Sequence, residues 1–281
     1  MDLVDCRFEG GLLPLLRSRV LAPVAHGFST RAGGVSGPPY ASLNVGMRWG
    51  DAQDNVLENR RRVAAACGAD RLCLVRQVHG AQVVCVTAKT SAETLAAAQA
   101  DAICTDLPGV AVGIFTADCV PLLIADPVSG AVAAVHAGWR GVLAGVASAT
   151  VAALVQTYGS RPCDLQVALG PAIGPCCFEV GTEVVAAFDE ELPAARVAGA
   201  IRDVDPSAGK KPHIDLKRAL LAALEAAGVP RVQIDAGAEC TMCDPAGRFY
   251  SYRRDNTQTG QHLSLIVAPR GRAAPSGLTS P

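Results

Sequence analysis

Three residues that can bind a soft or borderline metal occupy the same kind of place in the sequence. Cys119 lies in TADC between the apolar runs VAVGIF and VPLLIAD, His79 lies in QVHG between two apolar segments, and His136 follows an apolar run in VAAVHAGWRG. Each is therefore expected at a strand end, on a short rigid loop. Two imidazoles and one thiolate suit zinc and leave one tetrahedral position for water or substrate. If the three strand ends meet, a Cys-His-His zinc site forms, and bound zinc would lower the pKa of a water toward neutrality.

Spacing alone does not decide between this site and simpler roles, because the three residues are far apart and match no short metal-binding pattern. Each can instead be an isolated packing or hydrogen-bonding residue. Cys119 can also be a nucleophile. The neighbouring Asp118 can orient a ligand, transfer a proton or simply form an Asx turn.

The other cysteines are expected to have structural roles. A first group lies in or beside apolar segments and is interpreted as small core residues: Cys67, Cys73, Cys85 and Cys104. Cys240 and Cys243 are spaced like half of a zinc knuckle, but no second CxxC or HxxxH accompanies them. Cys176 and Cys177 are adjacent, so we expect that both cannot easily face one site. A structural zinc bound by these last four stays open as an alternative.

A further set of side chains lies on loops of small residues and could bind substrate. Guanidinium groups on glycine-rich loops suit phosphate or carboxylate. The candidates are Arg31 in STRAGG, Asn44 in SLNVG, Arg140 in GWRG and Arg253 in SYRRD. For the arginines, solvation at the surface or an ion pair with Asp106 or Asp118 is the alternative.

The elements that must position these residues alternate irregularly. We expect helices over 55–67, 91–99, 142–158 and 215–227, the last capped by Asp215. We expect strands over 72–78, 81–87, 110–115, 120–125, 131–135, 165–170, 232–237 and 263–268, with a tight bend at Gly80. This order, with several hairpin-like pairs, predicts an α+β (mixed α/β) fold with mixed sheets and helices outside. One domain over 1–268 and a disordered tail over 269–281 are expected.

Composition narrows the functional classes. The 281 residues are 50% apolar and 18% charged with a net charge of −1, which is typical of a compact protein and, without a dense Lys/Arg stripe, argues against binding nucleic acid or a membrane surface. The N-terminus MDLVDCRFEG lacks the pattern of a signal peptide, and no apolar run is long enough to span a membrane. Eleven cysteines without a secretion signal indicate reduced thiols and a cytoplasmic location.

The motifs together resemble one protein family. FSTRAGGVS, PYASLNVG, QVHG, DAICTDLPGVAVGIFTADCVPLLIADP, VAAVHAGWRG, GPAIGPCCFEVG and FYSYRRDNTQTG occur in the order typical of the YfiH/DUF152 family. This family is known as multicopper polyphenol oxidases (laccases) and later as purine nucleoside phosphorylases, and includes human FAMIN. The resemblance extends over roughly residues 24 to 267. One departure is TGQ at the end of the last motif, where members often have TGR, so any role of that arginine is in doubt at Gln261.

The resemblance implies a catalytic zinc bound by His79, Cys119 and His136, with copper as a substitute. It also implies a four-layer α/β/β/α sandwich shared with cytotoxic necrotizing factor catalytic domains. The implied activities are phosphorolysis of the purine nucleosides adenosine, inosine and 5′-methylthioadenosine, with phosphate as co-substrate, and adenosine deamination. We expect a monomer or weak homodimer.

Three alternatives stay open beside this interpretation. A multicopper oxidase needs many more histidines than the five in this chain, which leaves at most slow oxidation at a single copper. The fold relation suggests an amide hydrolase with Cys119 as nucleophile and His136 as base, acting on cell-wall precursors that carry the wrong first amino acid. A non-catalytic module with a structural zinc would need a fourth protein ligand.

Overall fold

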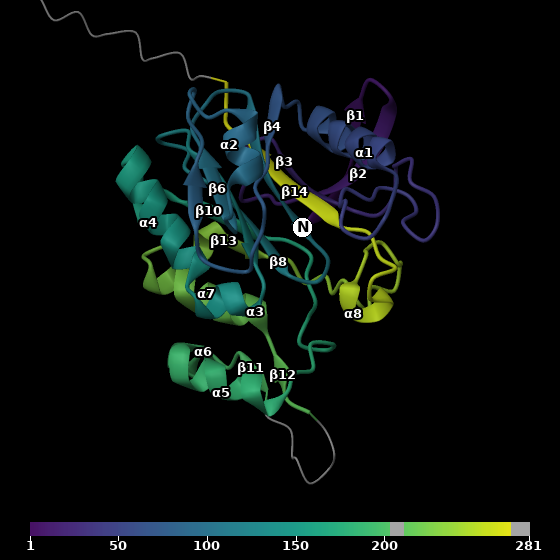
Figure 1. Ribbon diagram of the computed structural model, residues 1–281. Helices are drawn as coiled ribbons and strands as arrows, with labels where there is room; N and C mark the ends of the chain where they lie inside the picture. The colour runs from purple at the N-terminus through teal and green to yellow at the C-terminus, as the bar shows by residue number, and fades with distance from the viewer. Residues whose placement is uncertain (203–210, 271–281) are drawn as a thin grey trace, which may run out of the picture.

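Two six-stranded β-sheets form the centre of the computed structural model, which describes residues 1–202 and 211–270 (Figure 1). The first sheet has the order β1 (Asp2–Phe8), β2 (Gly11–Arg17), β3 (His26–Ser29), β14 (His262–Val267), β7 (Val110–Thr116), β4 (Arg71–Cys73). The second has the order β13 (Ile234–Ala236), β10 (Gln166–Leu169), β8 (Val120–Ala125), β9 (Val132–Ala137), β6 (Ala102–Thr105), β5 (Val83–Cys85). Both sheets are mixed, since β4–β7, β5–β6 and β10–β13 are parallel and the other pairs antiparallel.

Helices cover the outer faces of both sheets. Helix α1 (Gln53–Ala66) packs Val63 and Ala66 against Leu15 and Leu265 of the first sheet. On the second sheet lie α3 (Trp139–Leu143), α4 (Val146–Tyr158) and α7 (Leu216–Ala226), followed outward by α5 (Thr182–Glu191), α6 (Pro193–Val197) and the short pair β11 (Ile201–Arg202) and β12 (His213–Ile214). Helices α2 (Ala92–Ala97) and α8 (Tyr252–Asp255) are short.

Besides the two apolar cores between the helices and the sheets, a third apolar core lies between the two sheets and holds them together. Phe28 and Ile114 of the first sheet pack there with Leu123 and Ala134 of the second, while Leu122 points to the helices instead. Strands buried on both faces are uniformly apolar. This explains why VPLLIA and its neighbours have no polar alternation, and it confirms the four-layer α/β/β/α mixed fold.

Several predicted elements differ in detail. The helix expected over 142–158 is two helices, because Gly145 between them has a left-handed φ of 76°. The segments expected as neighbouring strands around Gly80 are shorter and lie in different sheets, with β4 beside β7 and β5 beside β6. Strands β1 and β2 were not predicted; in β1 the first four residues are exposed and carry no apolar alternation.

The chain crosses between the sheets twice near the same place. Residues 74–82 connect β4 to β5, and the three residues Ala117, Asp118 and Cys119 connect β7 to β8. Val120 pairs with Ala137 across β8 and β9, so Cys119 lies beside the end of β9 that carries His136.

Candidate active site

The two crossings and the end of β9 bring three predicted ligands together. The ligand atoms of His79, Cys119 and His136 all lie within 4.8 Å of one another. The two imidazole rings meet edge to face, with centroids 4.8 Å apart. The two connections between the sheets and strand β9 thus converge at one point. Cys119 and His136 lie at strand ends as predicted, whereas His79 lies within the connection between β4 and β5.

Asp101, at the start of β6, holds both histidines in place. Its buried carboxylate accepts hydrogen bonds from the backbone N–H groups of Val78, His79 and Gly80 at 3.2, 2.9 and 2.6 Å. Its Oδ1 also lies 2.7 Å from Nδ1 of His136. Burial raises the pKa of Asp101, but the bonds from His136 and the loop N–H groups outweigh it and keep the carboxyl ionised. A carboxylate on one ring nitrogen leaves the other nitrogen free for a metal or substrate.

Asp118 performs a corresponding task for the turn that carries Cys119. It adopts a left-handed φ of 90°, which is strained for a residue other than glycine. Its carboxylate accepts hydrogen bonds from the hydroxyls of Thr241 (2.6 Å) and Ser251 (3.0 Å) and from the backbone N–H of Arg253 (2.6 Å). These bonds stabilise the turn, so Asp118 positions the neighbouring thiol.

The electrostatics of the cluster favour a charged thiolate. Burial raises the pKa of the Cys119 thiol, but the imidazoles of His136 and His79 outweigh it and lower that pKa to about 6. Burial lowers the pKa of His136, whereas the Cys119 sulfur and Asp101 raise it to about 9. A thiolate is the form of cysteine that binds metals or acts as a nucleophile.

The residues present fit a zinc or copper ion. Two imidazoles and a thiolate match the soft, borderline donor set of zinc sites with an open position. Gly138 leaves the necessary space, because a Cβ there would lie 3.0 Å from Cδ2 of His79 and 3.1 Å from Sγ of Cys119. No fourth Cys, His, Asp or Glu joins this cluster among the described residues.

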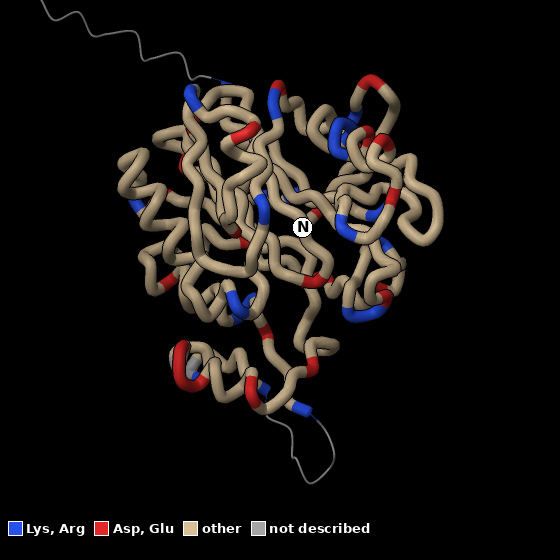
Figure 2. The backbone as a smooth tube through the Cα atoms, in the orientation of Figure 1, with Lys and Arg blue, Asp and Glu red and all other residues tan. Residues whose placement is uncertain are grey.

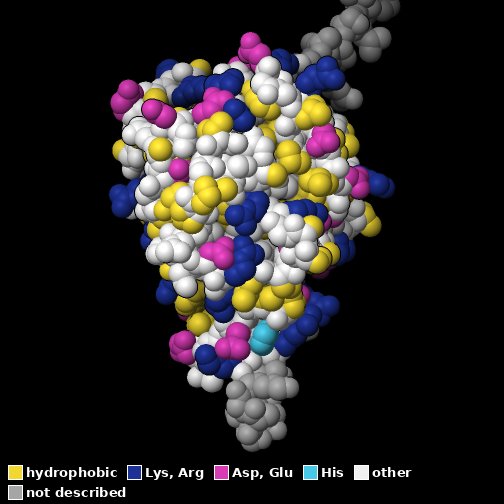
Figure 3. All heavy atoms as spheres, turned by 90° about the vertical axis from the view of Figure 1, so that its right-hand side faces the viewer, with side chains coloured by type: hydrophobic (Ala, Val, Ile, Leu, Met, Phe, Trp, Pro, Cys, Tyr) yellow, Lys and Arg dark blue, Asp and Glu magenta, His cyan; other side chains and the backbone are white. Residues whose placement is uncertain are grey.

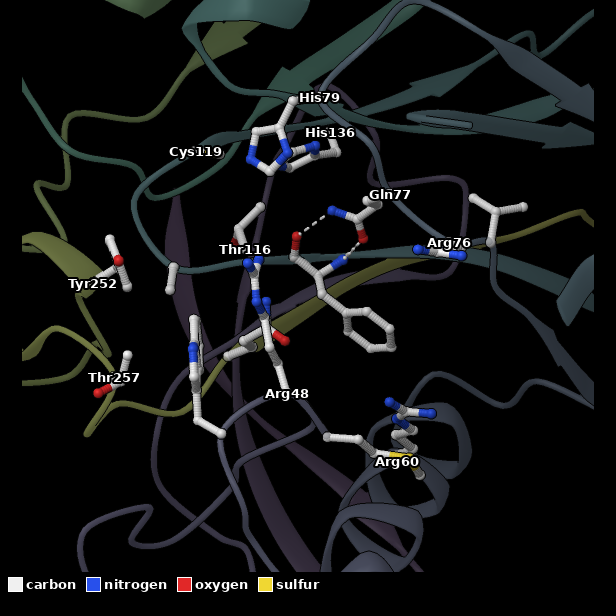
Figure 4. A pocket seen from close by; sticks show the side chains of 16 residues that line it. Arg48, Arg60, Arg76, Gln77, His79, Thr116, Cys119, His136, Tyr252 and Thr257 are labelled. Atoms are coloured by element: carbon white, nitrogen blue, oxygen red, sulfur yellow. Dashed lines mark hydrogen bonds between the residues drawn. The ribbon is translucent and has the colours of Figure 1, made fainter. Parts of the chain in front are cut away.

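A cavity of about 590 Å³ opens onto the three residues (Figure 4). His79 and His136 lie at one end and Arg60 at the other, with Arg48 and Arg76 also in its lining. The side chain of Gln77 is fixed in the wall, since it exchanges two hydrogen bonds with the backbone of Phe115 at 2.8 and 2.7 Å. The volume suits a drug-sized ligand.

Arg60 is the most constrained of the three cavity arginines. Its Nε donates to the carbonyl of Val45 at 2.7 Å, and its guanidinium lies over the Phe115 ring at 4.5 Å. Burial lowers the pKa of Arg60 to about 10, so it stays cationic at neutral pH. A fixed, partly desolvated guanidinium is a strong partner for phosphate.

The four residues predicted to bind substrate lie outside this cavity's lining. Arg31 donates to the carbonyl of Ala41 and stacks on Tyr250, and buried Asn44 spans the loop by bonds to Gly46, Asp51 and Gln261. Arg140 stacks on Trp139. Arg253 lines a smaller cavity of about 140 Å³ beside Cys119, where it donates to the carbonyl of Glu179. Gln261, the residue in place of the family's arginine, does line the main cavity.

Charge on the described residues is dispersed. Figure 2 shows Lys and Arg at separate places along the chain, interspersed with Asp and Glu. On the face turned to the viewer in Figure 3, basic side chains lie among hydrophobic and acidic ones. None of the helices in residues 1–202 and 211–270 is long and apolar enough to cross a membrane.

Sequence reasoning missed Asp101 and the three cavity arginines. Asp101 immediately precedes a buried strand in ADAICTD, and an isolated acid at such a point is the signal that could have marked it. Arg48, Arg60 and Arg76 lie on a loop, on α1 and between strands. Nothing in their local sequence distinguishes them from solvated arginines, because only the tertiary fold turns them to one cavity.

Comparisons with known proteins show which relatives and solved structures this chain resembles. The family model described as "Multi-copper polyphenol oxidoreductase laccase" matches residues 25–269. A protein of Deinococcus radiodurans named "Purine nucleoside phosphorylase" is 43% identical over 260 residues, 92% of this chain and 94% of its own length. "Purine nucleoside phosphorylase YfiH" of Escherichia coli is 41% identical over 242 residues, 85% of this chain and 91% of its own. The crystal structure of YlmD from Geobacillus stearothermophilus has a TM-score of 0.83 at 35% identity, covering 95% of this chain and 100% of that one.

Proposed function

The chain belongs to the multi-copper polyphenol oxidoreductase laccase family, and from this we propose that it is a zinc-dependent purine nucleoside phosphorylase. Similarity to relatives named purine nucleoside phosphorylase supports an enzyme that acts on small-molecule nucleosides. The finer proposal names adenosine, inosine and 5′-methylthioadenosine as substrates, with adenosine deamination as a second activity. The observation that carries it is the convergence of His79, Cys119 and His136 at the end of a cavity lined by arginines.

The reaction breaks the bond between the purine and C1′ of the ribose and forms a bond from a phosphate oxygen to C1′. The chain's contribution to the incoming anion is positive charge: Arg60 is fixed by Val45 and Phe115, and Arg48 and Arg76 share its cavity. These side chains would hold phosphate where it can attack C1′, in place of the loop arginines predicted from sequence.

At the other end of the cavity, the departing purine takes the bonding electrons and must be stabilised or protonated. A zinc ion held by His79, Cys119 and His136 would supply Lewis acidity at this point. Asp101 keeps the His136 ring oriented, and Asp118 keeps the Cys119 turn in place. Gln77 is committed to the backbone of Phe115 and shapes the wall instead of taking part in proton transfer.

The remaining histidines do not extend the site toward a multicopper cluster. His26 and His262 accept hydrogen bonds from the backbone N–H groups of Ser18 and Tyr250, and Nδ1 of His213 lies 2.7 Å from the carbonyl of Pro175. Within residues 1–202 and 211–270, the clusters that could hold a metal include none of these three histidines. A single copper in place of zinc is therefore the extent of the oxidase proposal.

The test is a nucleoside panel on zinc-loaded protein, with and without phosphate. We expect release of free base from adenosine, inosine and 5′-methylthioadenosine only with phosphate, and ammonia release from adenosine. Cys119→Ala should abolish both, whereas Cys163→Ala, at an exposed cysteine outside the cavity lining, should leave them unchanged. Failure of every nucleoside in both conditions would refute the proposal.

One observation favours a second candidate, a cysteine-dependent amide hydrolase acting on cell-wall precursors. Cys119 and His136 are close enough to act as nucleophile and base. In that case a thiol-directed substrate analogue forms a covalent adduct with Cys119 and chelation has no effect. The phosphorylase predicts a chelator-sensitive enzyme whose thiol is protected by metal. We also propose that residues 1–268 form a single domain and that the protein is a cytoplasmic monomer or weak homodimer. Most of the tail expected over 269–281 lies outside the described residues. Sedimentation of the purified protein by analytical ultracentrifugation tests the oligomeric state.

A further inference from the structure

Four cysteines outside the candidate active site meet at one point. The Sγ atoms of Cys176, Cys177, Cys240 and Cys243 all lie within 4.8 Å of one another. Sequence reasoning held that the adjacent Cys176 and Cys177 cannot easily face one site, and that expectation was wrong. Cys176 and Cys243 are 3.5 Å apart, Sγ to Sγ, although they come from loops far apart in the chain.

A tight turn explains how adjacent cysteines reach one site. The carbonyl of Gly174 accepts hydrogen bonds from the N–H groups of both Cys177 and Phe178, each at 2.9 Å, so the chain reverses there. A Cβ at Gly174 would lie 3.2 Å from Sγ of Cys176 and 3.4 Å from Cβ of Cys240. A side chain at this position would therefore crowd the Cys176 sulfur, so glycine favours the close approach of the two loops.

The second loop is docked onto the first by backbone pairing. Ala172 and Cys240 form a parallel bridge, and Thr241 N–H donates to the carbonyl of Ala172 at 3.0 Å. The N–H of Gly174 donates to Sγ of Cys240 at 3.2 Å. Donors aimed at a sulfur support its anionic, metal-binding form.

The distance between the sulfur atoms of Cys176 and Cys243 matches shared binding of a metal and does not match a disulfide bond. A tetrahedral zinc with Zn–S bonds of about 2.3 Å places its sulfurs about 3.8 Å apart. A disulfide requires about 2.05 Å. The observed 3.5 Å lies close to the first value. Four sulfur donors without a carboxylate or imidazole favour zinc over hard cations.

We propose that Cys176, Cys177, Cys240 and Cys243 bind a second zinc ion in a closed, four-thiolate structural site. Four protein ligands leave no open position, so this ion has no part in the chemistry. The two loops that it would join also hold the turn at Asp118: Ile173 N–H donates to the carbonyl of Asp118 at 2.9 Å, and the Thr241 hydroxyl donates to its carboxylate. The second zinc thus fixes the support of Cys119. This inference does not depend on the proposed reaction.

Metal content in a Cys119→Ala background tests the proposal, because the active-site set then lacks a ligand. After zinc loading and gel filtration, Cys119→Ala should keep one tightly bound zinc per chain. Adding Cys243→Ser should remove it, and adding the matched control Cys163→Ser should not. The cobalt-loaded Cys119→Ala protein should show thiolate-to-cobalt charge-transfer bands of a tetrahedral four-sulfur site, and these should disappear with Cys243→Ser.

If the Cys243→Ser variant fails to fold, alkylation of the cysteines in the wild-type chain tests the proposal instead. Cys176 and Cys243 are exposed, so zinc should block their alkylation and a strong chelator should restore it, while exposed Cys163 reacts in both states. Loss of all zinc in Cys119→Ala, zinc that stays after Cys243→Ser, unprotected thiols, or a Cys176–Cys243 disulfide in its place would overturn the proposal. An inactive wild-type enzyme with a zinc-bearing Cys119→Ala variant would refute only the proposed function.

Discussion

Replacing Asp101 with asparagine tests whether this residue orients the metal ligands, because the substitution leaves all three ligands in the chain. Oδ1 of this buried carboxylate faces the His79 N–H and Nδ1 of His136, whereas Oδ2 faces the N–H groups of Val78 and Gly80. Asn has one oxygen and one NH₂ group, so in either rotamer one of these two pairs loses its acceptor. At about 1–3 kcal/mol for each of the two unsatisfied groups, the change should lower the free energy of unfolding by about 2–6 kcal/mol.

The same substitution should weaken zinc binding about 10–100-fold, the range observed when a carboxylate that orients a metal-bound histidine is removed. Competition with a zinc chelator of known affinity measures this directly. Phosphorolysis should fall with zinc occupancy and recover in part at high zinc concentration, because all three ligands are still present.

Asp126→Asn is the matched control. Asp126 is also buried, and its carboxylate accepts hydrogen bonds from Val128 N–H and from the N–H and hydroxyl of Ser129 in the turn between β8 and β9. It should lose stability with unchanged zinc affinity. If Asp101→Asn binds zinc as tightly as wild type while it is destabilised like the control, Asp101 does not orient the ligands and the reasoning is refuted.

Three further outcomes are expected. Arg60→Gln should raise the KM for phosphate about 10–100-fold, because one charged hydrogen bond is lost. Arg61→Gln, on the outer side of the same helix, should leave this KM unchanged. Equal effects of the two substitutions would contradict the assignment of Arg60 to the cavity. Burial lowers the pKa of His262 from 6.5 to about 3, so the unfolded chain binds the extra proton and stability should fall by about 3 kcal/mol between pH 7 and pH 4.5. Urea unfolding at both pH values should show this loss reduced in His262→Gln and retained in His213→Gln. Gly138→Ala should lower zinc affinity at least tenfold by crowding two ligands, and wild-type affinity in a chelator competition would exclude that steric role.

Regular, buried segments were predictable because their patterns are local. The apolar runs of β8 and β9 and the capped helix α7 lie within a residue or two of their expected bounds, and Asp215 caps α7 by accepting from Arg218 N–H. Strand β1 was missed because its exposed residues carry no periodic signal. Sequence also could not tell that β4 and β5 belong to different sheets, since that depends on parallel partners elsewhere in the chain.

The candidate site was likewise predictable from the sequence only in part. The sequence contexts of Cys119 and His136 correctly predicted strand ends, whereas His79 lies within a connection between strands; the structure brings all three together. Arg60 gains its significance only from tertiary contacts, and the one local sign of Asp101 was an isolated acid before a buried strand. The four-cysteine cluster was misjudged because the orientation of two adjacent side chains depends on the turn at Gly174.

The central place of β14 has a consequence for synthesis on the ribosome. This strand comes near the end of the described chain, yet it lies between β3 and β7 in the middle of the first sheet. The second sheet is complete once β13 has emerged. Strand β3 can pair with β2 early, but its second partner, β14, is synthesised more than two hundred residues later. Such a long-range pairing is slow to form and leaves strand edges open meanwhile. Strands β5, β6, β8 and β9, which carry or adjoin Cys119 and His136, can therefore pair long before β14 is synthesised, and the cavity closes only when β14 joins the first sheet.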